Sequence, residues 1–287
     1  MAAIPTLAAL AACLDRPLVV IDVGCRWGFD PRWQALGRQV KLIGFDADAT
    51  ECQRLREAGG PGTTTYVAAA FGAAPGQARL FVTREPACSS LYSPDPELIA
   101  ERPELACTTL RAITALELTT LDDWALDAGI QEVDFLKLDT QGSELDILRG
   151  AQRTLRSVRA LEVEVELNPI YRGQPLFGDV DRFLRERDFV LWRLGHLVHY
   201  GLPGGVSDFA VEDRQFFDSQ LVAVASRGGQ VFWGHALYVR REMAQGKRAA
   251  DHLLAVRDAC IATILGFEDL AASALGEAGS GSTRARL

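Results

Sequence analysis

Short apolar runs alternate along the chain with charged, amphipathic runs, and this rhythm is typical of an α/β protein. Residues 18–23 and 41–45 are apolar runs that end in Gly24 and Asp46, as expected of strands buried on both faces of a parallel sheet. Residues 31–39, between these two runs, have room for a short crossover helix. The pattern therefore predicts consecutive strand-helix-strand units from residue 18 onward.

The same rhythm continues over most of the chain. We expect further strands at residues 64–70, 77–82, 115–119, 133–138, 161–167, 189–194 and 231–240. We expect helices at residues 48–58, 121–128, 143–157 and 180–187, and a mostly helical segment at 241–275. Residues 85–104 are rich in Pro, Ser and acidic residues, which predicts a long surface loop.

These elements predict two units. An α/β domain spans residues 1–243 and begins with a helix inside residues 1–17, and a helical extension spans residues 244–287. The extension ends in a low-complexity tail from residue 277 that we expect to be mobile. The apolar face of the helix expected at 249–267 could pack into the core, cover a substrate pocket or form a homo-oligomer interface.

Composition narrows the classes of function. The 48% of hydrophobic and 24% of charged residues are ordinary for a globular protein and exclude a disordered or fibrous chain. The net charge of -8 disfavours a nucleic-acid partner and an anionic membrane surface. The six cysteines contain no CxxC and are expected to be reduced, and the apolar stretch at residues 2–14 is too short to span a bilayer. We therefore expect a cytoplasmic protein without a transmembrane segment.

A glycine-containing loop follows the first predicted strand in VIDVGCRWG, residues 20–28. Glycines let the main chain approach a ligand closely, and a carboxylate at the end of the next strand, here Asp46, can accept both hydroxyls of a ribose. This pairing predicts a nucleoside ligand. Arg26 and Phe29 stand where a dinucleotide fingerprint needs glycines, which disfavours NAD. The alternative interpretation is a tight turn with an ordinary helix-capping aspartate.

A second polar segment, KLDTQGSE at residues 137–144, follows the strand expected at 133–138. Alternation places Lys137 and Asp139 on one face of that strand, and it likewise places Glu164 and Glu166 on one face of the next strand. A lysine in a buried strand needs a partner, and we expect Glu164 to be that partner. Asp139 and Glu166 are then left nearer the mouth of the crevice, where they can serve function.

Together these motifs resemble the FkbM-type S-adenosylmethionine-dependent methyltransferases over roughly residues 18–195. The segments that carry the resemblance are VIDVGCRWG, GFDAD, ACSSLY, LTTLDDW, VDFLKLDTQGSELDILRGA and EVELNPIYRGQPLF. The positions that match the two most specific family motifs are Asp22, Val23, Gly24, Gly28, Lys137, Asp139, Gly142 and Glu144. Gln141 stands where the family has a glutamate, and Cys25, Arg26 and Trp27 depart from the family's first loop.

The resemblance implies a Rossmann-like methyltransferase sheet of seven strands, the last antiparallel, with S-adenosylmethionine lying across the carboxyl ends. Asp46 would hold the ribose, the loop at 24–28 the methionyl part, and residues 69–71 would pass the adenine. The residues expected to bind the cofactor are Asp22, Gly24, Cys25, Arg26, Gly28, Asp46, Ala47, Ala70 and Phe71. The residues expected to border the acceptor are Ser89, Ser90, Glu166 and Tyr171.

Methyl transfer to a hydroxyl also requires a group that takes the proton. The candidates are Asp139, Glu144, Glu166, His196 and His199, and we expect Asp139, Glu144 and His196 to be the catalytic residues. Glu144 has a second interpretation as a favourable acid at a helix N-terminus. Asp139 and Glu144 could instead bind a divalent cation, but no third ligand is evident and we expect no metal.

The expected function is O-methylation of a hydroxyl on a small molecule or a sugar of a glycan. The alternative is a non-catalytic nucleoside-binding or scaffold protein with the same fold, which Gln141 and the altered first loop suggest. A third class, a nicotinamide-dependent oxidoreductase, is weakened by the missing glycines.

Overall fold

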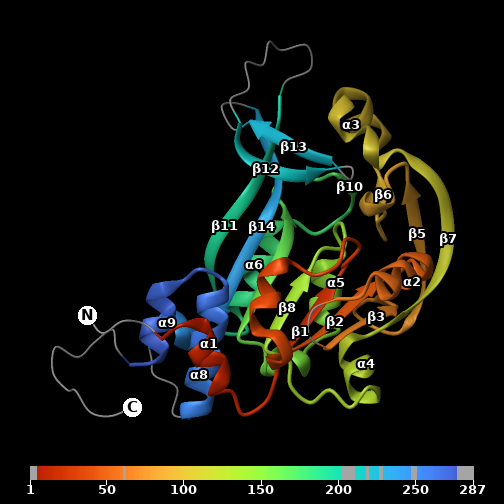
Figure 1. The fold of residues 1–287 in the computed structure, drawn as a ribbon. Coiled ribbons are helices and arrows are strands. Elements are labelled where there is room, and N and C mark those ends of the chain that lie inside the picture. The colour runs from red at the N-terminus through yellow and green to blue at the C-terminus, as the bar shows by residue number, and fades with distance from the viewer. Residues whose placement is uncertain are drawn as a thin grey trace.

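The computed structural model describes residues 5–60, 63–201, 211–217, 220–225, 229–246 and 251–276 (Figure 1). For residues 211–217 and 220–225 it describes the course of the main chain only. The tail that we expected to be mobile, from residue 277, lies outside the described residues. No described helix is long and apolar enough to cross a membrane.

A seven-stranded sheet forms the centre of the molecule, in the order β11-β14-β9-β8-β1-β2-β3. Its strands are β1 (Leu18–Val23), β2 (Val40–Asp46), β3 (Thr63–Ala68), β8 (Phe135–Leu138), β9 (Ala160–Glu166), β11 (Phe189–Tyr200) and β14 (Gln230–Arg240). Strand β14 runs antiparallel to both of its neighbours, and the other described pairs in the sheet are parallel. This arrangement confirms the predicted Rossmann-like sheet whose last strand is antiparallel.

Helices cover the two faces of the sheet and bury separate cores (Figure 1). One face packs against α1 (Leu7–Ala12), the 3-10 helix η1 (Pro31–Gln39), α8 (His252–Ile264) and α9 (Glu268–Ala274). The other face packs against α4 (Leu121–Asp127), α5 (Glu144–Arg149) and α6 (Phe177–Arg185). Residues of α8 and of β1 belong to one buried cluster, so the helices after residue 251 share the core of the sheet.

The helix after β2 forms as the sequence predicts, as α2 (Ala49–Ala58). The Asp48 carboxylate accepts hydrogen bonds from the main-chain N–H groups of Thr50 and Glu51, which satisfies two donors that the helix leaves unpaired. Gly59 ends the helix at a φ of 74°, a conformation that favours glycine. Local capping chemistry therefore fixes both ends of α2.

The segment predicted as a loop is ordered, and that prediction was wrong. It contains the 3-10 helix η2 (Pro86–Cys88), strand β6 (Ser93–Pro94), α3 (Pro96–Glu101) and the 3-10 helix η3 (Pro103–Thr108). A proline at the start of each helical turn presets its φ, and Asp95 caps α3. Strand β6 pairs with β10 (Tyr171–Arg172), so the segment is held against the chain that follows β9.

Two predicted strands belong to a separate sheet of order β4-β7-β5. It is built from β4 (Ala70–Phe71), β5 (Gly76–Thr83) and β7 (Leu110–Thr119), and Figure 1 shows β5 and β7 beside the central sheet.

The helix predicted at residues 143–157 divides into α5 and the 3-10 helix η4 (Thr154–Arg156). The chain also contains α7 (Arg241–Ala244) and an unpredicted hairpin of β12 (Val211–Phe217) and β13 (Gln220–Ala225).

Candidate active site

Three neighbouring strands change from apolar to polar along one face of the sheet. Phe135 of β8, Ala160 of β9 and Leu237 of β14 belong to the core under α1 and α8. Toward the carboxyl edge of β8 and β9, the same face carries Lys137, Asp139, Glu162, Glu164, Glu166, His235 and Trp233. The helices of this side cover the apolar positions, and the polar positions other than Lys137 line a cavity.

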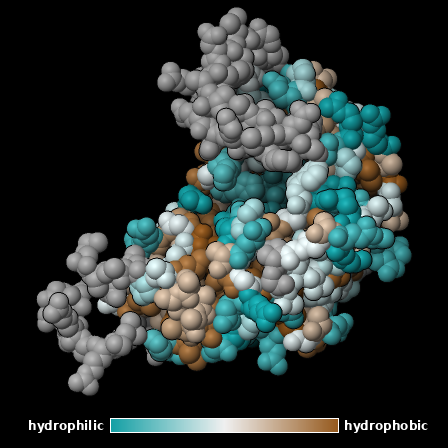
Figure 2. All heavy atoms as spheres, in the orientation of Figure 1, coloured by the Kyte–Doolittle hydropathy of each residue, from teal (hydrophilic) through white to brown (hydrophobic). Residues whose placement is uncertain are grey.

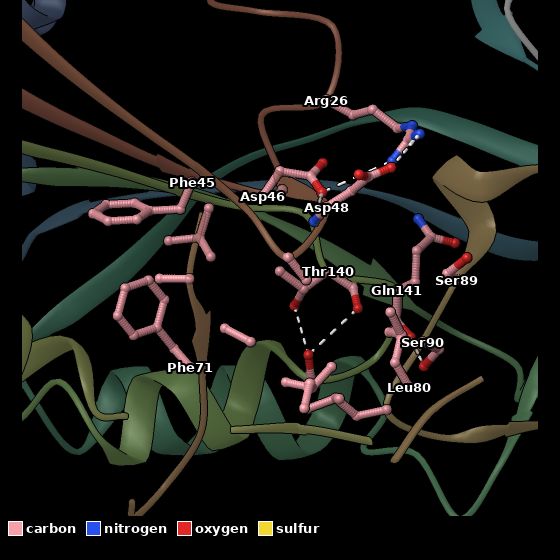
Figure 3. A pocket seen from close by; sticks show the side chains of 18 of the residues that line it. Arg26, Phe45, Asp46, Asp48, Phe71, Leu80, Ser89, Ser90, Thr140 and Gln141 are labelled. Atoms are coloured by element: carbon pink, nitrogen blue, oxygen red, sulfur yellow. Dashed lines mark hydrogen bonds and ion pairs between the residues drawn. The ribbon is translucent and has the colours of Figure 1, made fainter. Parts of the chain in front are cut away.

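A first cavity of about 380 Å³ lies at the carboxyl ends of β1, β2 and β8 (Figure 3). Of the residues expected to bind the cofactor, its lining includes Gly24, Arg26, Asp46, Ala47, Ala70 and Phe71. Its apolar wall includes the Phe45 and Phe71 rings, whose centroids are 4.8 Å apart in an edge-to-face arrangement. The cavity therefore joins a polar loop and carboxylate to an apolar, aromatic wall.

The main chain of the first loop approaches the end of β8 closely. A Cβ atom on Gly24 would lie 1.8 Å from the Asp139 carbonyl oxygen, and Gly24 has a φ of 89°. Both facts exclude a side chain there, as the sequence predicts for a loop that brings main chain to a ligand. Three other residues expected to bind the cofactor behave differently. Asp22 of β1 and Cys25 are buried, and neither they nor Gly28 line the first cavity.

Asp46 ends β2 at the mouth of this cavity, beside the first loop. Its Oδ1 atom accepts a hydrogen bond of 2.7 Å from the Asp48 N–H and lies 3.8 Å from Arg26 Nη1. Arg26 also reaches Asp48, with 3.3 Å between Nη2 and Oδ2 (Figure 3). Burial raises the pKa of Asp46 above its ordinary value, while the Asp48 N–H and Arg26 act in the opposite direction.

A second cavity of about 360 Å³ lies next to the first one. Gly24, Arg26, Asp139 and Gln141 line both cavities, so the two spaces meet at the loop and at the end of β8. The polar lining of the second cavity includes Glu162, Glu164, Glu166, Tyr171, His196 and His235. Figure 2 shows a hollow with a largely hydrophilic lining on this side of the molecule.

The predicted pairing of Lys137 with Glu164 is wrong. Lys137 Nζ lies 3.0 Å from Asp139 Oδ2 and 3.5 Å from Asp22 Oδ1. The reason is the register: Lys137 stands opposite Asp22 of β1 and opposite Glu162 of β9, whereas Glu164 lies one position nearer the carboxyl edge on that face. Burial lowers the pKa of Lys137, but the charges of Asp139 and Asp22 prevail and raise it above its ordinary value.

The Glu144 side chain stabilises the loop after β8 through hydrogen bonds. Its Oε1 accepts hydrogen bonds from the Thr140 N–H at 2.6 Å and the Thr140 hydroxyl at 3.1 Å, and its Oε2 accepts one from the Gly142 N–H at 2.9 Å. The side chain is buried and lines neither cavity, and burial raises its pKa to about 7. These contacts favour the structural interpretation of Glu144 over the catalytic one.

The residues expected at the acceptor divide between the cavities. Glu166 and Tyr171 line the second cavity, and Ser89 and Ser90 line the first. Ser90 donates a 2.6 Å hydrogen bond to the Gln141 carbonyl oxygen, and the Tyr171 hydroxyl donates one of 2.7 Å to the Cys88 carbonyl oxygen. Both bonds tie the segment after β5 to the chain around the two cavities.

The structure also places His235 and Trp233 in the second cavity, and sequence reasoning missed both. They stand opposite Glu164 and Glu166 across the β14–β9 pair. His196, expected to be catalytic, lines the same cavity within β11, and its ring centroid is 5.7 Å from that of His235. His199, the other histidine candidate, does not line either cavity. The alternation of FWGHALYVR was the signal that could have found Trp233 and His235.

Burial and mutual repulsion govern the carboxylates of the second cavity. Burial and then the Asp139 charge raise the pKa of Glu164 well above its ordinary value, and burial and then the Glu144 charge do the same for Glu166. Burial also acts to raise the pKa of Asp139, but Lys137 holds it below its ordinary value. Of these three carboxyl groups, Asp139 is therefore the one whose charged form is favoured by its surroundings.

This sheet order, with a glycine loop after β1 and an acid at the end of β2, defines a nucleoside-binding α/β protein of the methyltransferase type. The sequence of residues 49–191 matches the model of the methyltransferase FkbM domain. The chain belongs to this FkbM family and is an S-adenosylmethionine-dependent methyltransferase.

One curated relative is 2-O-methyltransferase NoeI of Sinorhizobium fredii, which is 26% identical over 186 residues. The match covers 60% of this chain and 74% of the relative.

Among solved structures, the chain is similar to magnesium protoporphyrin IX methyltransferase ChlM from Synechocystis PCC 6803 with bound SAM. The identity is 12%, the match covers 82% of this chain and 76% of that one, and the TM-score is 0.32. It is also similar to TrmK of M. capricolum in complex with S-adenosylhomocysteine, at 7% identity, 93% and 99% coverage and a TM-score of 0.36. At such scores these likenesses add nothing to the family assignment.

Proposed function

We propose that the protein transfers the methyl group of S-adenosylmethionine to a hydroxyl of a small molecule or a sugar. The observation that carries the proposal is the pair of adjoining cavities, one beside Asp46 and the other lined by carboxylates, which meet at Gly24 and Asp139. The relative named as a 2-O-methyltransferase supports transfer to oxygen.

The cofactor occupies the first cavity in this proposal. Asp46 accepts hydrogen bonds from the ribose hydroxyls, and the main chain of the loop at Gly24 faces the methionyl part. Ala70, Phe71 and the neighbouring apolar wall take the adenine, because they offer flat apolar contact and main-chain polar groups. The sulfonium methyl then points toward the junction with the second cavity.

The acceptor occupies the second cavity. A hydroxyl hydrogen-bonds readily to the carboxyl groups that line this cavity, which favours a polyol as acceptor. In the reaction the acceptor oxygen forms a bond to the methyl carbon while the carbon–sulfur bond breaks and its electron pair stays on sulfur. Asp139 takes the hydroxyl proton in this proposal, because it is the carboxylate that lines both cavities.

The first test is calorimetric titration of the purified protein with S-adenosylhomocysteine, with NAD as the control ligand. We expect saturable binding of S-adenosylhomocysteine and no binding of NAD. Sugars and small polyols are then screened as acceptors with S-adenosylmethionine labelled in its methyl group. If NAD bound and S-adenosylhomocysteine did not, the assignment of the first cavity would be wrong. If the cofactor bound and no hydroxyl compound accepted the methyl group, a non-catalytic nucleoside-binding protein would be the better description.

Asp46→Ala tests the ribose contact. Hydrogen bonds to a charged group contribute about 1.5–3 kcal/mol each, and Asp46→Ala removes every ribose hydrogen bond to this carboxylate, so it weakens S-adenosylhomocysteine binding by at least about tenfold. The control is Asp127→Ala, an exposed aspartate near the end of α4, which should leave the affinity unchanged. Equal affinities of the two variants would contradict the role given to Asp46.

A further inference from the structure

Asp139, Glu164 and His235 come together in the second cavity on three neighbouring strands. One carboxylate oxygen of each acid and one ring nitrogen of His235 lie within 4.8 Å of one another. His235 is paired with Glu164 in the register of β14 and β9. In β8 and β9, Leu138 pairs with Val163, so Asp139 follows at the level of Glu164. Neighbouring strands are about 4.8 Å apart, so the sheet itself sets this spacing.

The three side chains offer oxygen and nitrogen atoms of the kinds that commonly bind a divalent cation. Two carboxylates and one imidazole form a mixed oxygen and nitrogen set suited to Mn²⁺ and similar ions, and three protein ligands leave positions for a substrate oxygen. The expectation that no metal binds was based on Asp139 and Glu144, for which no third ligand was evident. In the structure Glu144 lines neither cavity, and Glu164 and His235 join Asp139 instead.

A further carboxylate, Glu162, lies beside the ring of His235. Its Nδ1 atom is buried and makes no hydrogen bond within the described part of the chain, although Glu162 Oε1 is 3.3 Å away. Metal-binding histidines commonly have a carboxylate beside the ring, which fixes its orientation. Arg32 holds Glu162 in turn, with 2.7 Å between Nη2 and Oε2.

Among the described residues, cations contact Asp139 and Glu162, and no ion pair reaches Glu164. Lys137 contacts Asp139 and Asp22, and Arg32 contacts Glu162, whereas Glu164 accepts a 2.6 Å hydrogen bond from the neutral amide of Gln141 and shares a hydrogen bond with Asp139. The same amide nitrogen lies 3.4 Å from Asp139 Oδ1, so a hydrogen-bond donor stands between the two acids. A cation between these acids would compensate their mutual repulsion more fully than an amide does.

We propose that Asp139, Glu164 and His235 bind a divalent cation of the Mn²⁺ type, which holds the acceptor hydroxyl beside the cofactor cavity. The role of the ion in methyl transfer rests on the proposed function, whereas its binding does not. The ion would lower the pKa of a bound hydroxyl, and Asp139 would be the proton acceptor beside it. A carboxylate has about four lone-pair sites, so Asp139 can both ligate the ion and accept this proton.

The test measures Mn²⁺ directly, without acceptor or methyl transfer. Tag-free protein is treated with a chelator, freed of it and titrated with Mn²⁺, and the electron paramagnetic resonance signal of the free ion reports binding. We expect one saturable site in the wild-type chain. His235→Gln and Glu164→Gln should each weaken it by at least about tenfold. His252→Gln, which changes an exposed histidine at the start of α8, is the matched control and should bind as the wild type does.

Titration of every variant with S-adenosylhomocysteine separates the possible failures. A variant that still binds the cofactor product is folded around the first cavity, so its loss of Mn²⁺ is local. Absence of Mn²⁺ binding by the wild-type chain up to about 1 mM would overturn the metal site, and so would equal binding by wild type and His235→Gln. If the wild-type chain bound Mn²⁺ but not S-adenosylhomocysteine, the proposed function would fail while the metal site remained.

Discussion

Asp139→Asn is expected to lower kcat by about 10²- to 10⁴-fold, the usual contribution of a positioned general base. The exchange keeps the shape of the side chain and removes its charge and its capacity to take a proton. Asp139 is suited to this role because it lines both cavities, and Lys137, 3.0 Å from its Oδ2 atom, favours its charged form. The measurement is a steady-state assay with the acceptor found by the screen.

If Asp139 is the general base, Asp139→Asn should lower kcat without a matching loss of affinity for S-adenosylhomocysteine. The affinity of Asp139→Asn for S-adenosylhomocysteine should stay within about tenfold of the wild type, because the ribose and adenine contacts lie elsewhere in the first cavity. Asp127→Asn, an equivalent exchange at the exposed end of α4, should leave both quantities unchanged. Unaltered kcat in Asp139→Asn would show that another group takes the proton, and His196 would then be the next residue to replace.

The parts of the fold that local chemistry decides could be predicted from the sequence. The apolar run before Gly24 and the run before Asp46 became β1 and β2, and the Asp48 cap and Gly59 terminus became the ends of α2. These signals act over a few residues, within one strand or one helical turn. The approach of Gly24 to Asp139 follows from two such strand ends meeting at one edge of the sheet.

The parts that depend on distant pairing could not be predicted in the same way. Alternation along β8 and β9 placed Lys137 and Glu164 on one face, but only the register showed that Lys137 stands opposite Asp22 and Glu162. His235 reaches Glu164 because β14 inserts antiparallel between β9 and β11. A single sequence contains the alternation of β14 but not the strand beside which it will lie, so the third candidate metal ligand stayed hidden.

The ordered segment between β5 and β7 shows a related limit. Its Pro and Ser content suggested a loop, but Ser90 and Tyr171 bind it to the chain around the cavities through the Gln141 and Cys88 carbonyl oxygens. Hydrogen bonds between segments 51 and 83 residues apart in the chain leave no periodic pattern in the sequence. Composition alone therefore underestimates how firmly such a segment is held.

Asp258→Ala is expected to lower the free energy of unfolding by about 3–5 kcal/mol, the usual cost of removing one partner from a buried ion pair. Asp258 of α8 and Arg159, just before β9, are both buried, and their two contacts are 2.7 Å from Nε to Oδ1 and 2.8 Å from Nη2 to Oδ2. Burial raises the pKa of Asp258 even though Arg159 opposes it, whereas Asp258 and Glu242 raise the pKa of Arg159 against the effect of burial. Without Asp258, the guanidinium stays buried with Glu242 as its remaining carboxylate contact among the described residues.

The measurement is urea unfolding, followed as the midpoint at unchanged m-value. Asp15→Ala is the matched control, because Asp15 pairs at 2.6 Å with Arg257, the neighbour of Asp258 on α8, but at a more exposed position. An exposed pair contributes less than about 1 kcal/mol. A double exchange, Arg159→Met with Asp258→Leu, should recover most of the lost stability because it leaves no buried charge. Equal midpoints for Asp258→Ala and Asp15→Ala would mean that α8 is held to the sheet by its apolar contacts alone.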